Sequence, residues 1–121
     1  MIVAEQFDYA NTLRWVKGEL DEALKEARQL LESFIEHPAQ TDGMLQCAAL
    51  LRITHGTLQM LEVYGAAMLA EEMEAVALGL AQGKIEQRED ACEVLVRAIL
   101  QLPDYLERLR SGFRDIPLVL L

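Results

Sequence analysis

The sequence predicts an all-α protein: an up-down-up-down antiparallel bundle of four helices, with the start of a fifth helix at the C-terminus. In four long segments, apolar residues recur at alternating steps of three and four, which is the spacing of one buried helical face. No stretch shows the strict alternation of apolar and polar residues that is typical of a half-buried strand. Only a few residues join the segments, and short connections make consecutive helices antiparallel neighbours.

The first two helices are predicted over about 9–36 and 42–62. The first ends at His37, because the residue before Pro38 is pushed out of the helical region. The positions expected to face the core are Leu13, Val16, Leu20, Leu24, Ala27, Leu31 and Phe34 in the first helix and Cys47, Leu51, Thr54, Leu58 and Leu61 in the second.

The third helix is predicted from about residue 66 until Gly83, and the fourth from about residue 87 until Gly112. Pro103 lies inside the fourth and should kink it, since proline lacks a backbone donor and clashes with the preceding turn. The expected core positions are Ala66, Leu69, Met73, Val76 and Leu80 in the third helix and Leu95, Ala98, Leu102, Leu106 and Leu109 in the fourth.

The chain is expected to divide into a bundle over 1–114 and the beginning of a following helix over 115–121. Asp115 can cap that helix, with Pro117 in its first turn. Its apolar run stops at Leu121 without a polar closing turn, as in a chain that has been cut. An exposed apolar end tends to become buried against another surface. We therefore expect a homodimer through this tail, or a tail packed between helices.

Composition and charge favour protein partners. The chain has 121 residues, enough for one hydrophobic core. Its formal net charge of −9 would repel nucleic acid and anionic membranes. The N-terminus does not resemble a secretion signal, no apolar run approaches the ~18 residues of a membrane span, and the expected location is the cytoplasm. Cys47 and Cys92 lie in apolar stretches and are interpreted as buried free thiols.

The spacing of chemistry-bearing residues predicts no metal site, no cofactor and no catalytic residue. Di-metal bundles need Glu-x-x-His pairs, but Phe34 stands three residues before His37 and Arg52 three before His55. The acidic run at 71–74 has no histidine at ligand spacing and is interpreted as a solvated face. No nucleophile elbow, phosphate loop or Cys-x-x-Cys motif is present.

One cluster on the second helix stands out as a candidate docking face. Arg52, His55, Gly56 and Gln59 fall at i, i+3, i+4 and i+7, so they are expected to share the outward face of that helix. A glycine inside a helix costs about 1 kcal/mol relative to alanine. Gly56 therefore indicates that something approaches the helix closely, that two helices of the bundle pack tightly there, or that the helix simply tolerates the glycine.

Residues 52–60 resemble the motif of histidine phosphotransfer (HPt) domains, four-helix bundles whose second helix exposes His-x-x-Lys-Gly. With Gly56 in register, Arg52 stands in the place of the phosphorylated histidine and His55 in that of the lysine. A guanidinium is permanently protonated and has no lone pair to accept a phosphoryl group. The resemblance thus implies a degenerate HPt-like module that docks a protein without transferring phosphate.

Three segments, 13–20, 55–67 and 98–106, resemble the N-terminal part of ChpA/PilL proteins, which are CheA-like hybrid histidine kinases of the type IV pilus chemosensory system. This resemblance implies a fragment that is no enzyme by itself, within a parent histidine kinase. It implies a response regulator, a pilus hub protein or other domains of the parent as partners. A stand-alone FimL-like pilus regulator is the alternative parent.

Two other functions stay open. The chain could be an active phosphotransfer domain with His55 as acceptor, although that frame puts Leu58 and Gln59 where lysine and glycine belong, or with the hydroxyl of Thr54 or Thr57. It could also be a structural or dimerisation bundle.

Overall fold

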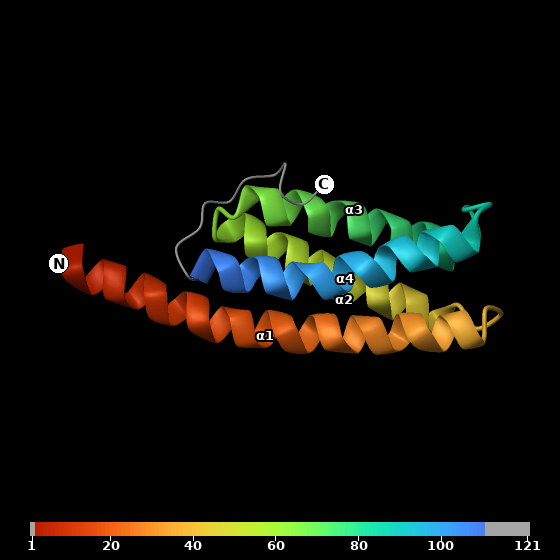
Figure 1. Ribbon diagram of the computed structural model, residues 1–121, viewed down its shortest axis with the longest axis horizontal. Coiled ribbons are helices and arrows are strands. Elements are labelled where there is room, and N and C mark those ends of the chain that lie inside the picture. Colours follow the sequence, from red (N-terminus) through yellow and green to blue (C-terminus); the bar gives the residue numbers. More distant parts are fainter. Residues whose placement is uncertain (1, 111–121) are drawn as a thin grey trace.

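The computed structural model describes residues 2–110, with the side chains of 14–108, and the all-α prediction is confirmed. The four helices are α1 (Ile2–Glu36), α2 (Asp42–Met60), α3 (Tyr64–Ala81) and α4 (Arg88–Arg110), and the described part of the chain contains no strand. Figure 1 shows consecutive helices running in opposite directions along one long axis.

The helix boundaries differ from the predicted ones at three places. α1 begins at Ile2, because no proline or glycine interrupts the sequence before Tyr9. α2 ends at Met60, and Glu62 in the following turn has a φ of 64°, a left-handed conformation that no helix can contain. α3 begins at Tyr64, two residues before the predicted start at about residue 66, and so includes the buried Gly65. The stop at Gly83 is confirmed by its φ of 67°.

Each helix packs against two others. α1 contacts α2 and α4, and α3 contacts the same two helices, so that the core lies between all four. The N-terminal turns of α1 reach beyond the ends of the other helices (Figure 1). α2 is therefore covered by α1 on one side and α3 on the other, and its remaining face turns outward.

Most predicted core positions are buried, with differences in α3 and α4. Leu69 and Val76 are only partly buried, and Ala70 and Ala77 take the core positions of α3. The alanines let α3 approach α2 closely, which leaves the larger side chains at the edges. In α4 the core is formed by Cys92, Leu95, Ile99, Leu102, Tyr105 and Leu106, while Ala98 is partly buried. Val16 and Leu61 are likewise partly buried, and the side chains of Leu13 and Leu109 lie outside the described set.

Few polar side chains are buried among the described residues. Thr54 is fully buried, and its hydroxyl donates a hydrogen bond to the carbonyl oxygen of Leu50 at 2.9 Å. Cys47 and Cys92 are buried free cysteines, as predicted. Burial raises the pKa of the Cys47 thiol to about 12, and burial is also the main reason that the pKa of Cys92 is raised. Both thiols are thus kept protonated and unreactive near neutral pH.

The predicted fifth helix at 115–121 and the predicted dimer through it cannot be compared with the structure, because these residues lie outside the described part of the chain. Within residues 2–110, no helix has the length and hydrophobicity needed to cross a membrane.

Candidate functional site

Arg52, Gly56 and Gln59 lie on the side of α2 that faces away from the bundle. The buried residues of α2, among them Leu51 and Leu58, turn toward the core. Arg52 and Gln59 are exposed and Gly56 is half-buried. These three predicted site residues therefore share one accessible surface.

This surface also carries large apolar side chains that the sequence analysis missed. Leu45 is 50% exposed, Ile53 63% and Met60 86%. They do not belong to the three-four pattern of core positions, so the sequence analysis passed over them. Their signal in the sequence is a large apolar side chain at a helix position outside that pattern. The outward face of α2 is defined by Leu45, Ala49, Arg52, Ile53, Gly56, Gln59 and Met60, of which all but Gly56 are exposed.

The outward face of α2 contains no acidic side chain. Asp42, in the first turn, is the one carboxylate among the residues of α2, although the chain as a whole has twenty. Arg52 is its one arginine or lysine, and it makes no ion pair with another described residue. An apolar surface with a single unpaired cation is thus present on a strongly acidic protein.

Gly56 is not needed for packing inside the bundle. A β-carbon built at this position meets no atom within 4 Å. Of the three explanations that the sequence left open, tight packing between helices of the same chain has no support here. Two explanations stay open: the helix simply tolerates this glycine, or something outside the bundle approaches the space above Gly56.

His55 lies apart from the other three predicted site residues, at the seam between α2 and α3. Its Nε2 is 3.3 Å from Oε2 of Glu71, and its Nδ1 is 3.8 Å from Oε1 of Glu74. Its side chain is only 22% exposed. When protonated, the imidazole forms ion pairs with both carboxylates and ties α2 to α3.

The structure thus corrects two expectations about the acidic run at 71–74. Glu71 and Glu74 do have a histidine partner, and they belong to a contact between helices instead of a purely solvated face. Spacing along one helix could not reveal this pairing, because the partners lie on different helices. No group of three or more His, Cys, Asp or Glu side chains suited to a metal ion occurs in the described part of the chain.

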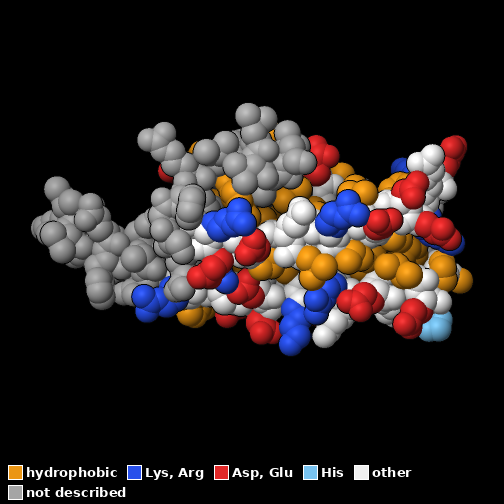
Figure 2. Space-filling view, viewed as in Figure 1, with side chains coloured by type: hydrophobic (Ala, Val, Ile, Leu, Met, Phe, Trp, Pro, Cys, Tyr) orange, Lys and Arg blue, Asp and Glu red, His pale blue; other side chains and the backbone are white. Residues whose placement is uncertain are grey.

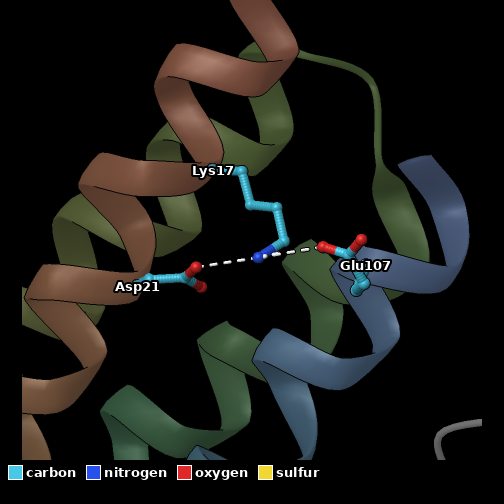
Figure 3. Close-up of polar contacts among 3 residues, drawn as sticks. All are labelled: Lys17, Asp21 and Glu107. Carbon is cyan, nitrogen blue, oxygen red and sulfur yellow. Dashed lines mark hydrogen bonds and ion pairs between the residues drawn. The ribbon is translucent and has the colours of Figure 1, made fainter.

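The face formed by α1 and α4 has a different character. Lys17 Nζ lies 2.8 Å from Asp21 Oδ2 on the same helix and 3.2 Å from Glu107 Oε2 on α4 (Figure 3). Figure 2 shows acidic and basic side chains mixed on this side of the molecule, around a seam of hydrophobic ones. A shallow groove of about 350 Å³ lies along the seam, lined by Asp21, Leu24, Lys25, Arg28, Ile99, Leu100 and Pro103.

A hollow of about 590 Å³ lies at the end of the bundle where the α1–α2 and α3–α4 connections meet. Its polar lining consists of Thr41 and the run of polar and charged residues 86–90, which leads into the start of α4. Neither a cysteine nor a histidine is among the residues that line it.

Comparison with known proteins gives one informative similarity. No protein-family profile and no solved structure match the chain. The chain is 34% identical over 113 residues to the scaffold protein FimL of Pseudomonas aeruginosa, a match that covers 93% of this chain and 20% of FimL. The chain therefore spans about a fifth of the length of the curated relative that it matches. This relative is of the type that the sequence analysis had ranked second, after the hybrid kinases.

Proposed function

We propose that the chain is a non-catalytic docking bundle of a type IV pilus chemosensory scaffold, and that it binds a protein through the outward face of α2. The observation that carries the proposal is the exposed, acid-free apolar surface around Arg52 on a protein with a net charge of −9. Exposed apolar patches of this kind mark interaction sites. The expected partner is a response regulator or a pilus hub protein in the cytoplasm.

Two further observations support a docking role. The similar protein FimL carries the name of a scaffold protein, and this favours a FimL-like parent over the hybrid kinase. The HPt-like motif has Arg52 in the place of the acceptor histidine, and a guanidinium cannot accept a phosphoryl group. A degenerate HPt-like bundle would keep the surface that meets its partner and lose the transfer step.

The alternative of phosphotransfer through His55 has less support. Both ring nitrogens point to glutamates of α3, at 3.3 and 3.8 Å. Two carboxylates beside the imidazole would repel the negatively charged phosphoryl donor and occupy the atoms that have to attack it.

A binding measurement with a matched control tests the proposal. The probe is a set of purified receiver domains of pilus response regulators, titrated with the chain by calorimetry. Ile53→Glu places a carboxylate on the outward face of α2, and we expect at least about tenfold weaker binding. Val94→Glu changes a similarly exposed side chain on α4 and should leave binding unchanged. Equal affinities for both variants would place the docking surface elsewhere.

The same samples separate docking from phosphotransfer. After incubation with a phosphorylated receiver domain, intact-mass analysis of the chain should show no added phosphate. A mass increase of one phosphate that disappears in His55→Gln would establish His55 as an acceptor and reject the docking-only role.

A further inference from the structure

We propose that two copies of the chain associate through the outward face of α2, with their α2 helices antiparallel and crossing at Gly56. The second copy would then cover the docking face in the free protein, and a protein partner would have to displace it. The inference uses the same face as the proposed function. It does not depend on the proposed partner, because it is tested on the chain alone.

Charge decides where two copies can meet. Each carries a net charge of −9, so most pairs of surfaces bring carboxylates together. The outward sides of the other helices all carry exposed acids, for example Glu22 and Glu26 on α1, Glu71 and Glu72 on α3, and Glu89, Asp90 and Glu93 on α4. The outward face of α2 has none, and it adds the unpaired cation of Arg52. Among the helix faces whose side chains are described, it is the one that brings no carboxylate of its own against a second copy.

The pattern of side chains on the face suits a two-fold axis through Gly56. In an antiparallel pair related by such an axis, residues equally far before and after Gly56 face each other. Arg52 then lies opposite Met60 of the second copy, and Ile53 lies opposite Gln59 of the second copy. The two guanidinium groups stay apart, and the apolar stem of each arginine packs on an exposed methionine.

The glycine of the face lies where the helices would come closest. Ala49 is on the same outward side but about two helical turns away from Gly56, and therefore away from the crossing. The exposed Ile53 and Met60 stand near Gly56. Glycine at a helix crossing lets two backbones approach, and the space above Gly56 is not used by any atom of its own bundle within 4 Å of an added β-carbon. A second helix would use this space.

The first experiment measures the mass of the chain in solution by light scattering and sedimentation over a range of concentrations. We expect twice the 13.6 kDa of one chain at high concentration. Gly56→Gln fills the crossing point and Ile53→Glu adds opposing carboxylates, and each should raise the dimer dissociation constant at least about tenfold. Gly18→Gln and Val94→Glu are the controls, since Gly18 is another helical glycine with open space and Val94 another exposed apolar residue. Both should behave like the parent chain.

The second experiment is a positive one and does not depend on a loss of function. A two-fold axis through position 56 brings both copies of that residue together, so Gly56→Cys should form an intermolecular disulfide under mild oxidation. Gly18→Cys should not. Cys47 and Cys92 are buried and add little background. Non-reducing electrophoresis reports the cross-linked fraction.

The outcomes distinguish this inference from the tail dimer and from the proposed function. Deletion of residues 116–121 should leave the dimer intact. A dimer that is lost on that deletion but kept in Gly56→Gln and Ile53→Glu would overturn the inference and assign association to the tail. A chain that is monomeric at every concentration, with no more cross-linking in Gly56→Cys than in Gly18→Cys, would also overturn it. Receiver-domain binding that persisted in that monomer would leave the proposed function standing.

Discussion

The α1–α4 face and the outward face of α2 differ in whether their basic side chains have acidic partners. On α1 and α4, several basic side chains pair with acids of their own or the neighbouring helix, as in the pairs Lys17–Glu107 and Arg97–Glu93, although Lys25 has no described ion pair. On α2, Arg52 has no ion pair with any described residue and stands among exposed apolar side chains. The outward face of α2 differs in having no carboxylate of its own that could pair with its cation. This absence, together with the exposed apolar side chains, makes the face suited to bind a partner.

The largest effect on the free energy of unfolding is expected for a substitution on the buried side of α2, compared with one on its exposed side. Leu58 is buried in the core and Met60, two residues later, is 86% exposed. Leu58→Ala should lower the free energy of unfolding by about 2 to 5 kcal/mol, because it loses transfer energy and leaves a cavity. Met60→Ala should change it by less than about 0.5 kcal/mol. Denaturant titration measures both, and a similar loss in the two variants would show that Met60 is covered.

The same comparison shows what the sequence could predict about the fold. The three-four spacing placed Leu51, Thr54 and Leu58 correctly, since a helix buries one face whatever its neighbours are. It failed for Leu69, which is only partly buried, because spacing cannot tell whether a leucine or the adjacent Ala70 faces the partner helix. That choice depends on how closely α3 approaches α2, a property of two helices. Leu69→Ala should accordingly cost less than Leu58→Ala.

A smaller effect is expected at the ion pairs of the α1–α4 face. Lys17→Gln removes the contacts with Asp21 and Glu107, and it should lower the free energy of unfolding by about 0.5 to 1 kcal/mol. The effect is limited because both carboxylate side chains are more than a third exposed, so water screens them. Lys25→Gln is the control, since Lys25 is an exposed lysine of α1 without a described ion pair.

The pH dependence of this difference has a definite sign. The hydrogen bond to Asp21 raises the pKa of Lys17 above its ordinary value of 10.5, with Glu107 acting in the same direction and burial opposing both. A raised pKa in the folded state gives stability that is complete below the pKa of the unfolded state and is lost as the pH rises through the folded value. The gap between the parent and Lys17→Gln should thus be constant from pH 6 to about pH 9 and shrink above about pH 10.5. A gap that grew in this alkaline range would contradict the assignment.

The candidate site was predictable in part. Helical periodicity placed Arg52, Gly56 and Gln59 on an accessible face, because each lies outside the core stripe of α2. Periodicity alone did not place His55, which stands at the edge of that face and is drawn to Glu71 and Glu74 of α3. The apolar half of the face was missed because a leucine or methionine in a helix is more often a core residue than an exposed one. The positions of Leu45, Ile53 and Met60 off the buried stripe are a signal in the sequence, and the packing of the four helices shows that all three remain exposed.

The smallest effect is expected when the motif on α2 is changed to the HPt pattern. In Arg52→His combined with His55→Lys, the first substitution alters an exposed side chain that has no described ion pair. The second keeps a cation beside Glu71 and Glu74, because lysine is charged at neutral pH and is long enough to reach both. The free energy of unfolding should change by less than about 0.5 kcal/mol, as for ordinary surface substitutions. The single variant His55→Ala removes the tie to α3 and is the matched comparison, with a larger loss expected than in the double variant. A loss of several kcal/mol in the double variant, measured by denaturant titration, would mean that Arg52 packs into the bundle, and the outward face of α2 would then need a different register.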